Sequence, residues 1–196
     1  MCQLIESIKL LDGTFHNLEY HQRRMESSLK ELFGSYPVVN LEDRLQDWPM
    51  TGLFKCRIRY DIDFFEVGYV TYQMTSIRSL KIVEDNTVEY EYKYANRSDI
   101  ERLFNKREAC DDIIIVKDGL VTDSSYTNLL FRQDNCWYTP QKPLLKGTKR
   151  EELLDKGLIN EKEIPLQDVT RYESIKLINA MRGFEQEGID VSNIVF

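Results

Sequence analysis

The chain has 196 residues and a formal net charge of −7, from 26 lysines and arginines against 33 aspartates and glutamates. This length fits one large domain or two small ones that share a core, and a hydrophobic fraction of 42% excludes wholesale disorder. A net anionic surface repels phosphate backbones, which makes nucleic acid a poor first guess as a partner.

The cysteines and the N-terminal segment indicate the cellular compartment of the protein. The four cysteines form no CxxC pair and, with only two histidines, give no zinc-ligand spacing. Residues 1–13 have neither the basic opening nor the apolar run of a signal peptide, and no later segment approaches the ~18 apolar residues of a membrane span. These features predict a cytoplasmic protein with no bound metal and no membrane partner.

The first half predicts a small α+β lobe over residues 1–86. Gln3–Leu11 alternates apolar and polar residues before an Asp-Gly turn, as a strand does. Leu18–Phe33 has apolar residues at helical spacing, and Leu41–Trp48 predicts a short helix that ends before a proline. Further strands are predicted at Leu53–Tyr60, Val67–Met74, Lys81–Val83 and Val88–Tyr92, with a hairpin loop at Asp61–Glu66.

The second half predicts a larger α+β lobe over residues 87–196. Ile100, Leu103 and Phe104 form the buried stripe of a helix, and Asp111–Val116 is apolar on both faces, which is typical of a central strand. Further elements are predicted as strands at Val121–Asp123, Asn128–Arg132, Cys136–Tyr138 and Ile175–Ile178, a turn at Lys117–Leu120, and a helix from Thr148 through Leu154. The expected fold class is therefore α+β, with two lobes and a site between them.

Several residues are of types that carry chemistry, but each also has an ordinary structural explanation. Lys93 ends a strand-like run, where a lysine is usually a solvent-facing edge residue. Arg24 is one of two adjacent arginines, which is typical of a solvated helix face, and Asp123 follows a strand where an Asx-turn is common. Gly147-Thr148 is a helix start, although the amides of a helix N-terminus are also a standard cradle for phosphate.

The order and spacing of five segments resemble the class IV aminotransferase family, the pyridoxal phosphate (PLP) enzymes of fold type IV, and within it the aminodeoxychorismate lyase subgroup. The segments are LIESIK with DG at 4–13, HQRRM with a serine at 21–28, KYANR at 93–97, VTDSSYTNLLF at 121–131, and LLKGTKR at 144–150, followed by INA and a glycine at 178–183. The resemblance implies a two-lobe, D-amino acid aminotransferase-like architecture with a shortened N-terminus.

The resemblance also implies roles for the site residues. Lys93 is the catalytic lysine, which forms the Schiff base with PLP and then moves protons at the substrate carbon. Arg24 and helix-terminal amides bind the phosphate, and Asp123, where the family usually has glutamate, meets the ring nitrogen. The implied cofactor-binding residues are Arg24, Lys93, Asn96, Asp123, Gly147, Thr148, Lys149 and Asn179.

Three functions follow from these residues. The first is a lyase that converts 4-amino-4-deoxychorismate to 4-aminobenzoate and pyruvate for folate synthesis. The second is an aminotransferase of a small D- or branched-chain amino acid, and the third is a non-catalytic binding protein derived from the family. A homodimer is expected because relatives of this fold dimerise.

The sequence does not single out one residue that binds the substrate carboxylate. The loop Asp61–Glu66 is short and acidic, where many relatives carry a Gly- and Arg-rich segment that receives the substrate carboxylate. Candidate partners for that carboxylate are Lys9, Arg57, Arg59, Arg97 and Arg182.

Overall fold

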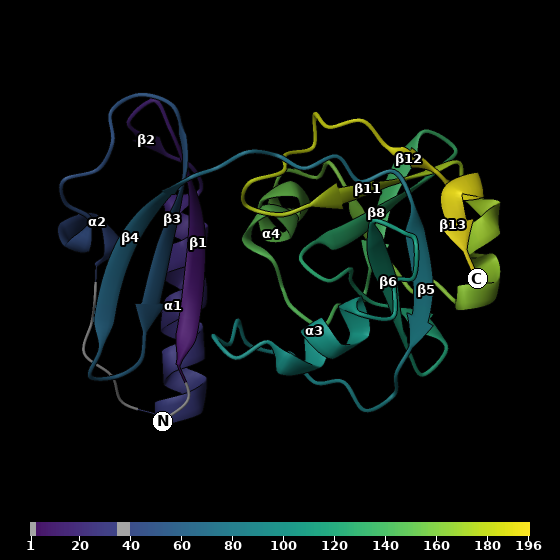
Figure 1. The fold of residues 1–196 in the computed structure, drawn as a ribbon, viewed down its shortest axis with the longest axis horizontal. Coiled ribbons are helices and arrows are strands. Elements are labelled where there is room, and N and C mark those ends of the chain that lie inside the picture. Colours follow the sequence, from purple (N-terminus) through teal and green to yellow (C-terminus); the bar gives the residue numbers. More distant parts are fainter. Residues whose placement is uncertain (1–2, 35–39) are drawn as a thin grey trace. The chain divides into compact units, whose positions relative to one another are not determined.

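The structure is a computed structural model that describes residues 3–34 and 40–196. The chain folds into two compact units, each with its own sheet structure (Figure 1). Unit 1 comprises Met1–Met74 and Tyr92–Asn96, and unit 2 comprises Thr75–Glu91 with residues 97–196. Helices and strands occur in both units, so the predicted α+β class is confirmed.

Unit 1 is a four-stranded antiparallel sheet with a long helix. Its elements are β1 (Leu4–Leu11), β2 (Thr14–Phe15), α1 (Leu18–Phe33), α2 (Leu41–Arg44), β3 (Leu53–Tyr60) and β4 (Phe65–Thr71), and the sheet order is β2-β1-β3-β4. Asp12 and Gly13 both have positive φ, 46° and 77°, which suits the two-residue turn that joins β1 to β2.

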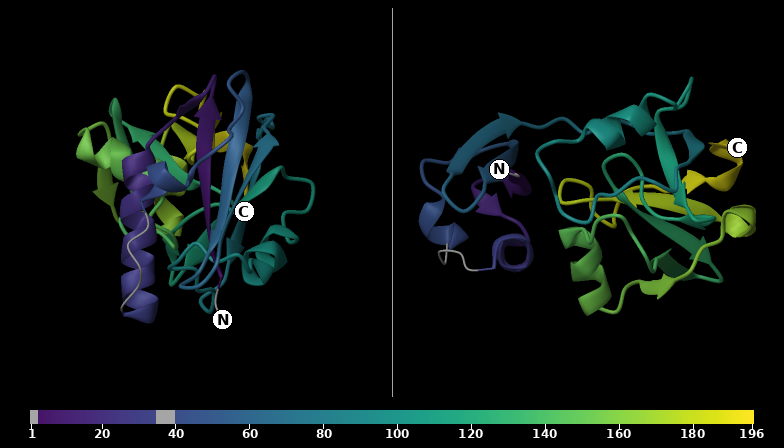
Figure 2. Two further views of the ribbon diagram at one scale, coloured as in Figure 1. Left: turned by 90° about the vertical axis from the view of Figure 1, so that its left-hand side faces the viewer. Right: turned by 90° about the horizontal axis from the view of Figure 1, so that it is seen from below.

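The core of unit 1 lies between this sheet and α1. Alternate residues of a strand share a face, so Leu4 and Ile8 of β1 point with Ile58 of β3 toward Met25 and Leu29 of the helix. The left-hand view of Figure 2 shows α1 along one side of this sheet. The opposite face of the sheet therefore has no cover from α1.

The predicted helix Leu41–Trp48 is shorter in the structure. α2 ends at Arg44, and Leu45 is already extended, with φ −84° and ψ 123°. Trp48 instead turns onto the sheet edge, where its Nε1 donates to the Gly13 carbonyl over 3.1 Å and its ring meets Phe15 edge-on. Tertiary packing of the indole outweighs the weak helical preference of a short segment.

Unit 2 consists of two sheets around one core. Its elements are β5 (Leu80–Glu84), α3 (Ser98–Phe104), β6 (Asp112–Lys117), β7 (Leu120–Val121), β8 (Asn128–Gln133), β9 (Cys136–Pro140), α4 (Thr148–Asp155), β10 (Asn160–Lys162), η1 (Leu166–Arg171), β11 (Ser174–Ile178), β12 (Ile189–Asp190), η2 (Val191–Asn193) and β13 (Ile194–Val195). The sheet orders are β10-β9-β8-β11-β12 and β13-β5-β6-β7. β6 is an inner strand with both faces buried, as predicted.

The division between the units differs from the expected boundary at residue 86. β5 pairs in parallel with β6, so the segment from Thr75 belongs to unit 2, and Tyr92–Asn96 then returns to unit 1. Parallel pairing requires a crossover connection, here through α3, and alternation within a single strand does not show which strand will be its partner.

The predicted strand Val88–Tyr92 is wrong. Val88 and Tyr90 are buried while Glu89 is exposed, which explains the alternation, but the segment is irregular. Its backbone groups bond outside any β-ladder, since Lys117 Nζ donates to the Val88 carbonyl over 2.9 Å.

Among the residues that the structure describes, no helix combines the length and apolar character needed to cross a membrane.

Candidate functional site

A buried ionic cluster in unit 1 surrounds Glu6 of β1. This carboxylate has no exposed surface and shares its strand face with the core residues Leu4 and Ile8. Arg24 of α1 donates two hydrogen bonds to this carboxylate, from Nε to Oε1 over 2.9 Å and from Nη2 to Oε2 over 2.5 Å. His21, one helical turn before Arg24, lies 2.6 Å from Glu6 Oε2 through its Nδ1. The fully buried Glu6 is thus compensated by neighbouring groups.

The protonation states within this cluster follow from its geometry. Burial opposes ionisation of Glu6, but the charge of Arg24 and the bond from His21 outweigh it and lower the pKa of Glu6 to about 2. Burial lowers the pKa of His21, although Glu6 acts in the opposite direction. Because an ionised carboxylate only accepts hydrogen bonds, the neutral His21 carries its proton on Nδ1. Burial also raises the pKa of the nearby Tyr60 hydroxyl.

Lys93 reaches this cluster through the segment that returns to unit 1. Ile5 N–H donates to the Lys93 carbonyl over 2.8 Å, and Ala95 N–H donates to the Gln3 carbonyl over 2.8 Å. An antiparallel bridge between Leu4 and Tyr94 completes the pairing. The charge of Lys93 also contributes to lowering the pKa of His21. Unit 1 therefore brings Lys93 and Arg24, two predicted site residues, to the same histidine.

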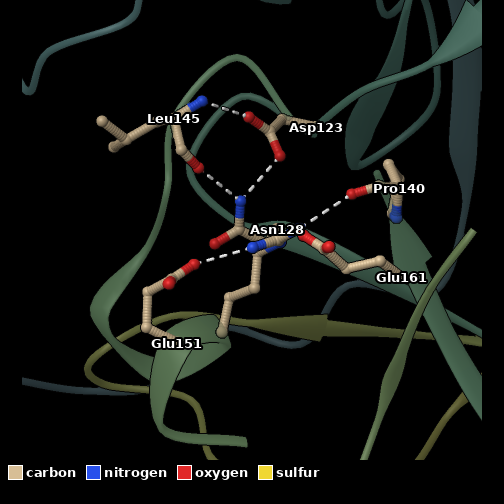
Figure 3. A network of polar contacts seen from close by, with 7 residues as sticks. Asp123, Asn128, Pro140, Leu145, Glu151 and Glu161 are labelled. Atoms are coloured by element: carbon tan, nitrogen blue, oxygen red, sulfur yellow. Dashed lines mark hydrogen bonds and ion pairs between the residues drawn. The ribbon is translucent and has the colours of Figure 1, made fainter. Parts of the chain in front are cut away.

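In unit 2, Asp123 lies in a second buried network (Figure 3). Its Oδ1 accepts from Asn128 Nδ2 over 2.7 Å, and its Oδ2 accepts from the Leu145 N–H over 2.9 Å. Asn128 Nδ2 also donates to the Leu145 carbonyl over 2.8 Å. Burial raises the pKa of Asp123 to about 6, although the bonds from Leu145 and Asn128 lower it in part. This carboxyl can therefore be stabilised further by a cationic partner.

Gly147 is the N-cap of α4 and lies against the amide of Asn128. A Cβ at this position would stand 2.0 Å from Asn128 Oδ1, so a larger residue cannot fit without moving the amide. The first amides of a helix have no intrahelical carbonyl partner, and those of Thr148 and Lys149 begin α4. The close approach of Gly147 thus links the start of α4 to the carboxylate network.

We expect Gly147→Ala to disturb this network. The new methyl group must displace Asn128, which is held by both Asp123 and Leu145, at a cost of about 1–3 kcal/mol in unfolding free energy. Urea unfolding measures this loss. Gly157→Ala is not a suitable control because φ is 64° there, whereas Gly68→Ala adds a methyl group to open space. Equal stability of the Gly147 and Gly68 variants would contradict the prediction.

Arg150 of α4 is almost fully buried. Its Nη1 lies 2.7 Å from Glu151, and its Nη2 lies 2.5 Å from Glu161 and donates to the Pro140 carbonyl over 3.1 Å. Its charge is among the influences that lower the pKa of Asp123. The guanidinium therefore joins α4 to β9 and β10 and contributes positive charge to the carboxylate site.

Three other candidates from the sequence have defined places in unit 2. Asn179 follows β11, donates through Nδ2 to the Tyr126 carbonyl over 3.2 Å, and accepts through Oδ1 from the backbone amide of Arg182 over 2.9 Å. The Arg182 guanidinium donates to the Thr75 carbonyl. Arg97 donates to the Ser125 carbonyl over 2.5 Å and stacks on the Tyr126 ring at 4.3 Å. Both arginines thus hold loops in place.

No functional role is predicted from the sequence for Glu6, His21 or Asn128. Glu6 could have been found, because it falls in the buried phase of the strand between Leu4 and Ile8, where an acid needs a partner. The hydrogen bonds of Asn128 to Asp123 and Leu145 depend on how distant segments of unit 2 pack together, and no local sequence pattern predicts them. Asn96 is exposed and belongs to unit 1.

Comparison with known proteins defines the class. Residues 71–186 match the class IV amino-transferase family, which is more than half of the chain. The fold is shared with proteins including a fold IV-transaminase from Curtobacterium pusillum, with a TM-score of 0.70 at 18% identity. The chain therefore belongs to the class IV aminotransferase family and has its fold type IV architecture.

Three individual relatives are similar to this chain over most of its length. A crystal structure of a protein from Haemophilus somnus 129PT, provisionally assigned as a 4-amino-4-deoxychorismate lyase, is 36% identical with a TM-score of 0.89, and the match covers 94% of this chain and 98% of that one. An uncharacterised protein from Haemophilus influenzae is 42% identical over 93% of this chain and all of its own. The aminodeoxychorismate lyase of Bacillus subtilis is 26% identical over 90% of this chain and 71% of its own.

Proposed function

We propose that the chain is a PLP-dependent lyase that converts 4-amino-4-deoxychorismate to 4-aminobenzoate and pyruvate. The observation that carries this proposal is the return of the segment Tyr92–Asn96 to the edge of β1, which brings Lys93 to the His21 and Glu6 cluster that also holds Arg24. The named activity of the Bacillus subtilis relative supports the same reaction.

The residues present fit PLP. In unit 1, the Arg24 guanidinium suits a phosphate dianion, and its orientation is fixed by two bonds to Glu6. In unit 2, taken by itself, the amides that begin α4 also suit an anion. A protonated ring nitrogen suits Asp123, because this buried carboxyl has a pKa of about 6 and gains from a positive partner. Gly147 leaves no side chain at the start of α4. PLP is therefore the cofactor in this proposal, with Lys93 as its covalent partner, while Asn96 and Asn179 stay predicted contacts that rest on the family resemblance.

The reaction needs a proton acceptor and an electron sink. Bound PLP supplies the sink. The Lys93 amine would take the proton from the carbon that bears the substrate amine, and the bond from the adjacent carbon to the ether oxygen would break. The departing enolate would then take a proton at carbon and leave as pyruvate. Asp123 would keep the ring nitrogen of bound PLP protonated, and Arg24 would hold its phosphate.

We expect Asp123→Asn to retain PLP and to slow turnover about 10²-fold or more. An amide in place of the carboxylate has a single oxygen, so it can accept only one of the two bonds that Asn128 Nδ2 and the Leu145 N–H donate, and it cannot hold a proton on the ring nitrogen. Pyruvate release and PLP binding, measured together, separate the two effects. Asp118→Asn, at an exposed turn, is the matched control. Unchanged turnover in Asp123→Asn would place this carboxylate away from the ring.

The proposed function is tested by the absorption spectrum of the protein with PLP, followed by borohydride reduction and peptide mapping. We expect a yellow protein, a reduced adduct on Lys93, and release of pyruvate from 4-amino-4-deoxychorismate. A colourless protein with no adduct would overturn the proposal and favour a non-catalytic binding protein.

The second candidate is an aminotransferase of a small D- or branched-chain amino acid, which the family matched by residues 71–186 favours through its main activity. Amino donors added one at a time distinguish the two. Keto-acid release in one equivalent, with no pyruvate from 4-amino-4-deoxychorismate, would favour transamination.

A cytoplasmic homodimer is part of the proposal, because the family resemblance implies dimers. Light scattering should give twice the chain mass of 23.2 kDa. A particle of the single-chain mass at the concentration used for the enzyme assay would contradict it.

A further inference from the structure

The sheet face of unit 1 opposite α1 concentrates positive charge. We use the name cationic face for the side chains of Lys9 on β1 and Lys55, Arg57 and Arg59 on β3. They alternate with the core residues of the same strands, so they share one face. Among the described residues of β1, β3 and β4, Glu66 is the one acid on this face. The positive charge of this face contrasts with the net charge of the whole chain, which is −7.

The strand register places these cations directly beside one another. β1 and β3 pair Lys9 with Lys55 and Ser7 with Arg57. Residues directly opposite in an antiparallel pair have Cβ atoms about 4.5–5.5 Å apart, and like charges in that position are destabilising. The cationic face is therefore costly to the free protein, and an anion bound over it removes that cost.

Arg57 is the member of the cationic face best placed to hold an anion. It is exposed, with Ser7 opposite on one side and Gly68 opposite on the other. The Gly68 side is open, because a Cβ there would meet nothing within 4 Å. In the described ranges, the Arg57 side chain has neither a hydrogen bond nor an ion pair, whereas the Arg59 side chain donates to Gln3 over 2.7 Å and lies 3.9 Å from Glu66.

The cationic face is close to the proposed catalytic lysine within the same unit. Ile5 N–H donates to the Lys93 carbonyl over 2.8 Å. Ile5 and Ser7 are alternate residues of β1, about 7 Å apart, and Ser7 lies opposite Arg57. Lys93 and Arg57 therefore flank β1, about 10 Å apart across the sheet and about 7 Å apart along it, which their two long side chains and a substrate can bridge.

We propose that the cationic face binds the carboxylates of the substrate, with Arg57 as the main anchor and Lys9 as its neighbour. This inference rests on the proposed function, since 4-amino-4-deoxychorismate carries two carboxylates. In this proposal, side chains of β1 and β3 determine the substrate specificity. The loop after β3 does not, because it is acidic in this chain. A guanidinium suits this task because it can meet a carboxylate with two parallel bonds.

The test uses chorismate, which has a hydroxyl in place of the reacting amine and keeps both carboxylates. Its affinity for the PLP-loaded enzyme is measured by calorimetry in the wild type, Arg57→Gln and Arg57→Gln/Lys9→Gln. We expect the dissociation constant to rise about 10-fold or more in Arg57→Gln and further in the double variant. Arg44→Gln, an exposed arginine over the Phe65 ring, is the matched control and should bind as the wild type does.

Turnover of 4-amino-4-deoxychorismate gives a second readout. We expect KM to rise by a similar factor in Arg57→Gln while kcat changes less than about threefold, because the lost contact is made equally before and during the reaction. Thermal unfolding of each variant checks that the exposed substitutions leave the fold intact.

The two proposals fail in different ways. Chorismate binding that is equal in the wild type and both variants would overturn the role of the cationic face, even if pyruvate is released. Undetectable chorismate binding to the wild type, or equally effective displacement by inorganic phosphate, would overturn it too. Weaker chorismate binding in Arg57→Gln without pyruvate release from any variant would support the carboxylate site and contradict the lyase.

Discussion

Lys93→Ala should abolish pyruvate release, with a loss of turnover of about 10³-fold or more. The alanine removes the amine that holds PLP covalently and the base that takes the substrate proton, and general base catalysis alone contributes about 10²–10⁴-fold. The backbone pairing of Lys93 with Ile5 does not depend on its side chain, so the fold should persist. Pyruvate release under substrate saturation measures the loss.

The control for Lys93→Ala is Lys142→Ala. The Lys142 side chain is 72% exposed and pairs with Glu163 at 3.2 Å, an exposed contact of small energetic value. This variant should match the wild type in rate and in its spectrum with PLP. Lys93→Ala with more than a tenth of the wild-type rate would show that another group moves the proton, and the assignment of Lys93 would be wrong.

The strongly periodic elements were predictable from the sequence. The predicted bounds of α1 and β3 match the structure, because each has uninterrupted apolar spacing and ends at a glycine or a loop. Pairing partners were harder to predict. Alternation reports which side chains are buried, so Val88–Tyr92 has the pattern of a strand although no neighbouring strand accepts its hydrogen bonds.

The candidate site was predictable in its residue types and less so in its contacts. The KYANR and HQRRM segments point to Lys93 and Arg24, and the structure assembles them in one unit. The partner of Arg24 is Glu6, and the strand that supplies it was predicted from its alternation and its family-like segment, with no role for the acid itself. Contacts such as Gly147 against Asn128 depend on tertiary packing, which a single sequence does not specify.

Glu6→Gln should destabilise the protein at neutral pH and reduce its sensitivity to acid. In the folded protein the pKa of Glu6 is about 2, well below the ordinary value of 4.5, because Arg24 and His21 outweigh the effect of burial. A depressed carboxyl pKa stabilises the folded state above about pH 5, and this stabilisation is lost as the pH falls toward 2. The shift corresponds to about 3 kcal/mol of unfolding free energy.

Urea unfolding of the cofactor-free protein between pH 7 and pH 3 tests this prediction. The wild type should lose stability steeply below pH 5, partly through other carboxylates such as Asp85, whose pKa is also lowered by its hydrogen bonds and by Arg102. Those contributions are common to both proteins, so the difference between wild type and Glu6→Gln reports the cluster of Glu6, Arg24 and His21. We expect a gap of about 3 kcal/mol at pH 7 that narrows as the pH falls, since the neutral amide leaves the Arg24 charge uncompensated at every pH.

Glu89→Gln, at an exposed position, is the matched control and should follow the wild-type curve. A gap between wild type and Glu6→Gln that stays constant from pH 7 to pH 3 would mean that Glu6 is not held ionised by Arg24 and His21. In that case the cluster could not fix the guanidinium by charge, and Arg24 would need a different explanation for its orientation toward a phosphate. A narrowing gap ties the acid sensitivity of unit 1 to the ion pair that orients Arg24 in the proposed cofactor site.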